Sequence, residues 1–128
     1  MTSLDKWAPN ALAVLRIVTA LLFMAHGTGK LVGYPALGFQ AELFSLMGFA
    51  AILEIVGSFL LILGLFTRPV AFILSGEMAV AYFMAHAPNG FLPILNQGES
   101  AVLFCFIFLF LVFSGPGAWS LDGKRAAA

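Results

Sequence analysis

Four long apolar runs, separated by short polar breaks, set the pattern of this sequence. They cover residues 9–31, 43–66, 69–87 and 97–115, and only a few charged positions interrupt them. A helix needs about 20 mainly apolar residues to cross a bilayer, and it satisfies its own backbone hydrogen bonds there. The pattern therefore predicts an all-α membrane protein, a four-transmembrane-helix bundle in which residues 1–128 form a single domain.

The breaks between the runs predict how the helices are connected. Thr67-Arg68-Pro69 leaves room only for a tight turn, and proline suits the first turn of a helix. The second and third helices are therefore expected to form an antiparallel hairpin. Pro88-Asn89-Gly90 and Gly115-Pro116-Gly117 are typical ends for the third and fourth helices.

Composition supports a lipid environment and excludes several classes of function. Hydrophobic residues make up 62% of the chain and charged residues only 9%, against about 25% charged in an average soluble domain. Because so few charges cannot cover a water-facing surface, the lipid bilayer is the expected partner of much of this chain. The formal net charge of zero gives no electrostatic basis for binding nucleic acid. The single cysteine, Cys105, excludes an internal disulfide.

Three ionisable residues lie deep inside the predicted spans and form a candidate buried polar centre: Arg16, Glu54 and Glu77. At a rise of about 1.5 Å per residue, all three lie roughly 12 to 18 Å from the same face of the bilayer. Charged groups in a bilayer are costly unless they find partners, so Arg16 is expected to pair with one or both glutamates. The trio would then either fix the helix register or take part in proton movement or polar ligand binding.

A second group of polar residues lies toward the opposite face, at the ends of three predicted helices. This outer polar cluster consists of His26, Lys30, His86, Asn96 and Glu99. Two histidines and a carboxylate can bind a divalent metal, so His26, His86 and Glu99 are candidate metal ligands. The alternative for Glu99 is an acid at a helix N-terminus, where it stabilises the helix dipole.

A recognisable set of residues is spread, in order, along nearly the whole chain. The set consists of Arg16, Phe23, His26, Gly27 and Lys30; Glu54, Gly57, Leu61, Gly64, Leu65, Thr67 and Arg68; Met78, Ala81 and His86; and Asn96, Glu99 and residues 115–117 and 120–122. Taken together, these residues resemble the DoxX family of small bacterial membrane proteins. The resemblance implies a four-helix membrane bundle.

The resemblance also implies a function. The family takes its name from the membrane subunit of a thiosulfate:quinone oxidoreductase, and its members are often associated with redox enzymes. The leading hypothesis is a membrane subunit of a redox assembly that interacts with quinone, with a protein partner or a second copy of the chain. Its catalytic residues stay unassigned. The alternatives are a transporter for a small solute, with or without proton coupling, and a structural membrane anchor.

Basic residues at the ends of the spans and in the connections between them predict the orientation of the bundle. One end carries Lys6, Arg68, Lys124 and Arg125, whereas the other end carries only Lys30. An excess of lysine and arginine in short connections favours the cytoplasmic side of a membrane. The chain is therefore expected to be a multi-pass protein of the bacterial cytoplasmic (inner) membrane, with both termini in the cytoplasm.

Cysteine labelling tests this orientation. In a chain with Cys105→Ser, the variant Asn89→Cys should react in intact cells with a thiol reagent that does not cross the inner membrane. The variant Ala126→Cys should react only after the cells are opened. The opposite labelling pattern would contradict the predicted orientation.

Overall fold

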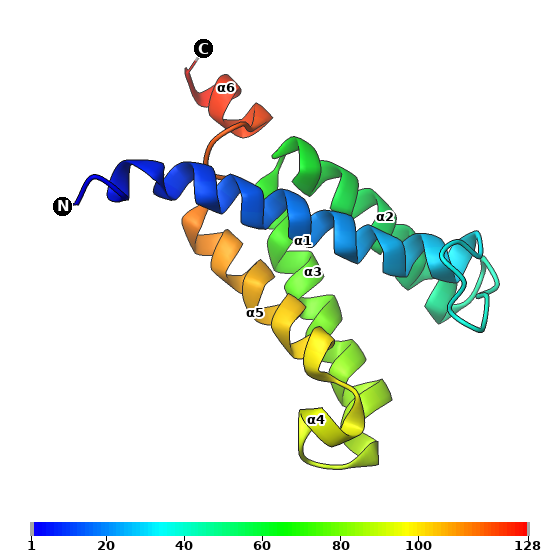
Figure 1. Ribbon diagram of the computed structural model, residues 1–128. Helices are drawn as coiled ribbons and strands as arrows, with labels where there is room; N and C mark the ends of the chain where they lie inside the picture. The colour runs from blue at the N-terminus through cyan, green and yellow to red at the C-terminus, as the bar shows by residue number, and fades with distance from the viewer. Residues whose placement is uncertain (1, 128) are drawn as a thin grey trace.

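The structure, a computed structural model, describes residues 2–127, and the regular elements in that range are all helices (Figure 1). Four long helices make up most of it: α1 (Ala8–Leu31), α2 (Leu46–Leu63), α3 (Thr67–Ala81) and α5 (Glu99–Ser114). The shorter pieces are the 3-10 turns Asp5–Trp7 and Ala87–Asn89, the π-helical turn Tyr82–His86, and helices α4 (Pro93–Asn96) and α6 (Leu121–Ala127).

The long helices have the length and surface of membrane spans. The stretches Asp5–Leu31, Leu46–Leu63 and Thr67–Asn89 are long and apolar enough to cross a bilayer, and α5 is a shorter apolar helix. Large apolar side chains project outward from these helices. Phe59 and Phe113, for example, are 55% and 76% exposed, as lipid-facing side chains would be. The structure therefore confirms the predicted four-helix membrane bundle.

The four long helices form two pairs that cross one another. α1 packs along α2 and α3 packs along α5, with much less contact between the pairs. Figure 1 shows the pairs close together near the α2–α3 turn and diverging toward their other ends. The buried core includes Phe23, Leu61, Leu74 and Phe108. A Cβ atom at Gly57 would lie 2.9 Å from the Leu74 side chain, so glycine lets α2 and α3 approach closely there.

The bounds of α2 follow from capping chemistry that shortens the predicted span. The helix begins at Leu46 because the Ser45 hydroxyl accepts a hydrogen bond of 3.0 Å from the Gly48 N–H. It ends at Leu63 because Gly64 adopts a left-handed conformation with φ of 67°, which glycine reaches without strain. Residues 43–45 and 64–66 of the predicted span therefore lie outside the helix.

The third and fourth spans also differ from the prediction. α3 starts at Thr67, and its α-helical part stops at Ala81. The chain then forms the π-helical turn Tyr82–His86, whose wider hydrogen-bonded rings rotate the side chains that follow. A regular α-helix would therefore present His86 on a different side. The fourth helix, α5, runs from Glu99 to Ser114, inside the predicted span.

Helix α6 is attached to the start of α3 through Asp122. Its carboxylate accepts hydrogen bonds from the N–H groups of Phe66 (2.8 Å) and Thr67 (2.9 Å), as a capping acid does. Partial burial opposes ionisation, but hydrogen bonds from Thr67 and Phe66 and the charge of Arg125 outweigh it and lower the pKa of Asp122. The α6 helix is thereby fixed to the end of the bundle where the two helix pairs meet.

Replacing Asp122 with alanine should destabilise the protein by about 1 kcal/mol, the usual loss for a helix cap. Because the pKa of Asp122 is lowered in the folded protein, its stabilisation is present at neutral pH and disappears as the pH falls through that lowered value. Thermal unfolding in detergent at neutral and acid pH measures both effects. The control Glu42→Ala removes an exposed acid that lies outside the helices, and equal unfolding temperatures for the two variants would contradict the capping role.

Candidate functional site

Arg16 is completely buried on α1, but its partners are backbone carbonyl groups and not glutamates. Its side chain donates hydrogen bonds to the carbonyl oxygens of Leu61 (2.8 Å), Pro116, Ala118 (3.1 Å) and Trp119 (2.8 Å). The predicted pairing of Arg16 with Glu54 or Glu77 is therefore wrong. The acidic residue whose charge acts on Arg16 is Asp122.

Carbonyl groups are available to the Arg16 side chain because α2 ends beside it. Leu61 is among the last four residues of α2, whose carbonyl groups lack the usual helical partners. A guanidinium group at this point also suits the negative end of the helix dipole. Gly64 leaves room for the contact, since a Cβ atom there would lie 3.2 Å from the Arg16 Cζ and 2.9 Å from the Ser120 Cα. The C-terminal segment therefore packs against the turn and encloses the guanidinium group.

Glu54 pairs instead with Lys30, which the sequence placed in the outer polar cluster. The Lys30 Nζ lies 3.0 Å from Oε1 and 2.8 Å from Oε2 of Glu54. The Glu54 side chain is fully buried and that of Lys30 is 17% exposed. Gly27, one turn before Lys30, makes the close approach of α1 and α2 possible, because a Cβ atom there would lie 2.9 Å from the Ala51 carbonyl oxygen.

Glu77 lies beside this ion pair, on the other helix pair. Its side chain is within hydrogen-bonding reach of Glu54, and its Oε1 atom is buried with no hydrogen-bond partner among the described residues. Glu54, Glu77 and Lys30 together line a cavity of about 490 Å³ between α2 and α3. The structure thus brings the two predicted glutamates together, with lysine and not arginine as their cation.

A second cavity, of about 470 Å³, shares Lys30 and Glu54 with the first and is lined by residues of both helix pairs. All four long helices contribute to its wall, together with the loop after α1 and the π-helical turn. Its polar and aromatic lining includes His26, Lys30, Glu54, His86, Gln97, Phe23 and Phe104. Met47 and Met78 add flexible apolar surface. We call this space the inter-pair cavity.

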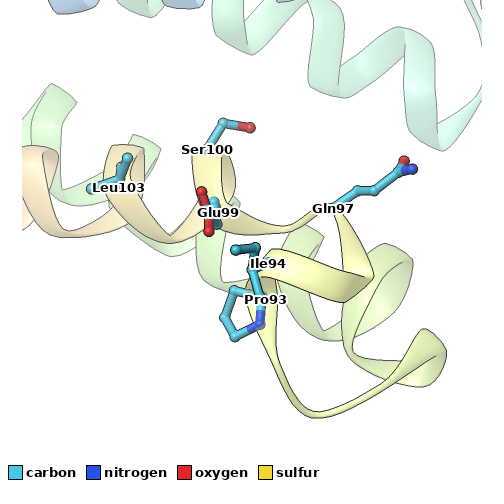
Figure 2. Close-up of a pocket in the computed structure, with 6 residues that line it drawn as sticks. All are labelled: Pro93, Ile94, Gln97, Glu99, Ser100 and Leu103. Carbon is cyan, nitrogen blue, oxygen red and sulfur yellow. The ribbon is translucent and has the colours of Figure 1, made fainter.

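The three candidate metal ligands are not assembled into one site. His26 and His86 both line the inter-pair cavity, but the Nδ1 of His86 donates a hydrogen bond of 3.1 Å to the Asn96 carbonyl group. Glu99 lies in a separate hollow of about 380 Å³ with Pro93 and Ile94 (Figure 2). Within residues 2–127, no group of three histidine, cysteine or acidic side chains is placed to bind a metal ion.

Asn96, the remaining member of the outer polar cluster, holds the corner between α4 and α5. Its side-chain amide donates to the Tyr82 hydroxyl (3.1 Å) and the Gly90 carbonyl (2.9 Å), and its Oδ1 accepts from the Gly98 N–H (2.8 Å). Asn96 is buried, and these hydrogen bonds satisfy the polar groups of its side chain. Its role is therefore structural. The outer polar cluster therefore divides into three parts: Asn96 at a structural corner, Glu99 in a separate hollow, and His26, Lys30 and His86 on the wall of the inter-pair cavity.

Comparison with known proteins identifies the family. A model of the DoxX family matches residues 11–87, more than half of the chain. The chain belongs to the DoxX family. The matched region covers most of α1 and all of α2 and α3 of this DoxX protein, and it includes Arg16, Lys30, Glu54 and Glu77.

The relatives of this DoxX protein are similar along most of their length. An uncharacterized protein of Haemophilus influenzae is 51% identical, with 97% of each chain covered. The inner membrane protein YphA of Escherichia coli is 30% identical, with 91% of each chain covered. The inner membrane protein YqjF of the same species is 29% identical over 85% of this chain and 87% of its own. No solved structure matches this chain.

The position of Arg16 predicts a specific loss of stability. Arg16→Lys keeps the charge but cannot reach carbonyl groups on two sides at once, and each buried carbonyl left without a partner costs about 1–3 kcal/mol. Arg68→Lys is the matched control, because Arg68 is exposed and also donates to two carbonyl groups, those of Val112 and Phe113. Denaturant unfolding in detergent should show a loss of at least about 2 kcal/mol for Arg16→Lys and clearly less for the control.

A double-mutant cycle checks that Arg16 and Glu54 are independent. Because they share no hydrogen-bond partner, the losses for Arg16→Lys and Glu54→Gln should add to within about 0.5 kcal/mol. A large coupling energy would show that Arg16 is paired with the glutamate after all.

Proposed function

We propose that this DoxX protein is a membrane subunit of a redox assembly and that it binds a quinone head group in the inter-pair cavity. The observation that carries the proposal is the cavity itself, in which aromatic side chains and ionisable side chains face the same space. At about 470 Å³, its volume falls in the range of about 300–1,000 Å³ that small-molecule sites occupy.

The lining of the cavity suits the two chemical halves of a quinone. The rings of Phe23 and Phe104 lie 5.1 Å apart at an interplanar angle of 56°, and His26 meets Phe104 edge-on at 5.7 Å. Such rings give a flat, conjugated head group apolar surface to pack against. His26 and Lys30 provide N–H donors for its two carbonyl oxygens. The lipid around the helix pairs would receive the apolar tail.

The electrons for the quinone would come from a partner subunit. An iron–sulfur cluster needs several cysteine thiolates, and this chain has only Cys105, which lies among phenylalanines and bonds through its carbonyl group to Ser75. This DoxX protein would therefore supply the quinone site within the membrane, and the partner would supply the redox centre. We place the assembly in the bacterial inner membrane, with both termini of this chain in the cytoplasm.

A transporter is the main rival, because the Lys30–Glu54 ion pair on the cavity wall also suits a small polar solute. A transporter must expose its site to both sides of the membrane in turn. Solute uptake by proteoliposomes that contain only this protein would support the transporter, whereas quinone binding without uptake would support the redox subunit.

Binding of a radiolabelled short-tail quinone to the purified protein in detergent tests the proposal. Saturable binding is expected, and Ala85→Phe should weaken it at least about tenfold, because Ala85 is an exposed residue lining the inter-pair cavity and the new ring would fill it. The control Ala79→Phe places the same ring on α3 at a residue that does not line this cavity. Absence of saturable binding, or equal binding by both variants, would contradict the proposal.

A further inference from the structure

The charges between α2 and α3 do not balance. Glu54 and Glu77 meet there with a single ammonium group, that of Lys30. Lys30 already donates to both carboxylate oxygens of Glu54 and neutralises that group. Glu77 therefore has no cation of its own among the residues that line this cavity. Arg16 does not compensate, since carbonyl groups occupy its side chain.

The hydrogen bonds show the same imbalance. An ionised carboxylate accepts hydrogen bonds but cannot donate one. Two ionised carboxylates at hydrogen-bonding distance therefore repel each other and cannot form a hydrogen bond between them. The Oε1 atom of Glu77 is buried and has no partner among the described residues, although Glu54 is within reach. A proton on either carboxyl group would turn this contact into a hydrogen bond and remove one of the two negative charges.

We infer that Glu54 and Glu77 bind one shared proton, and that this proton links the two helix pairs beside the cavities. The inference does not depend on quinone binding. Its ligand is the proton itself, held by two carboxyl groups that are partly compensated by Lys30.

The place of the two glutamates gives the shared proton a mechanical role. Glu54 and Glu77 lie eleven residues before and twelve residues after Leu65 in the turn between α2 and α3, which is roughly 16–18 Å along each helix. Glu54 belongs to the α1/α2 pair and Glu77 to the α3/α5 pair, and the pairs diverge beyond the turn (Figure 1). The Lys30–Glu54 ion pair stays within the first pair. A hydrogen bond from Glu54 to Glu77 would instead tie one pair to the other.

Among the described residues, few other ionisable groups lie around Glu54 and Glu77. On α1, His26 lies close enough for its charge to interact with Glu54 and Lys30. On the π-helical turn, His86 lines the inter-pair cavity with its ring bonded to the Asn96 carbonyl group. From α5, the residues lining that cavity are Ser100, Ala101 and Phe104, none of which is ionisable near neutral pH. Loss of the shared proton would therefore leave Glu54 and Glu77 to repel each other.

Infrared spectroscopy of the purified protein at a series of pH values tests the shared proton. The wild-type protein should show the carbonyl stretch of a protonated carboxylic acid at neutral pH, and the band should disappear at alkaline pH. Glu77→Gln should abolish the band, because the remaining Glu54 is neutralised by Lys30. Glu54→Gln should abolish it too, since Lys30 is then free to pair with Glu77. The control Glu99→Gln, in a separate hollow, should keep the band.

A distance measurement tests the link between the helix pairs. Spin labels at Val32→Cys and Ile94→Cys, both at exposed positions, report the separation of the pairs in a Cys105→Ser background. The distance should increase at alkaline pH in the protein with both glutamates and stay constant in Glu77→Gln, whose amide donates a permanent hydrogen bond to Glu54. An absent infrared band, a band that survives both glutamine variants, or a separation that does not respond to pH would each overturn the inference.

Discussion

The need to satisfy a buried guanidinium group governs this structure. Arginine cannot shed its proton inside a protein, so Arg16, which is completely buried on a membrane helix, must be surrounded by acceptors. The chain meets this need with carbonyl groups from the end of α2 and from the segment before α6. One side chain thereby holds α1, the α2–α3 turn and the C-terminal segment together, and Asp122 strengthens the junction by capping α3.

Because backbone carbonyl groups bind Arg16 at one end of the bundle, Glu54 and Glu77 are not needed as partners of Arg16. Because Arg16 requires no carboxylate, Glu54 can pair with Lys30, which reaches it where Gly27 brings α1 close to α2. Among the described residues, no basic side chain is then left to form an ion pair with Glu77. The polar residues of this DoxX protein thus form two centres. In the structural centre, carbonyl groups surround the Arg16 guanidinium group. The second centre, of Lys30, Glu54 and Glu77, lies beside two cavities and has an incomplete charge.

The sequence predicts the fold well because hydrophobicity and turn chemistry are local. Four apolar runs, the short Thr67-Arg68-Pro69 connection and the final glycines are enough for a four-helix membrane bundle with an α2–α3 hairpin. The partners of Arg16 could not be predicted in this way, because depth along a helix says nothing of rotation about its axis. Backbone carbonyl groups also leave no mark in the sequence. The π-helical turn before His86 similarly breaks the regular spacing from which a helix face is inferred.

The arrangement of the two centres gives the molecule a fixed end and a divergent end. At the fixed end, hydrogen bonds from Arg16 and Asp122 and the close contact of Gly57 with Leu74 hold the helix pairs together. At the other end the pairs diverge (Figure 1). Residues of both pairs line the two cavities. A change of charge at Glu77, about 18 Å from Leu65 along α3, would act where the helix pairs have already diverged (Figure 1). The incomplete charge therefore lies on the wall of the cavity between α2 and α3, where repulsion between Glu54 and Glu77 would act to separate the two helix pairs.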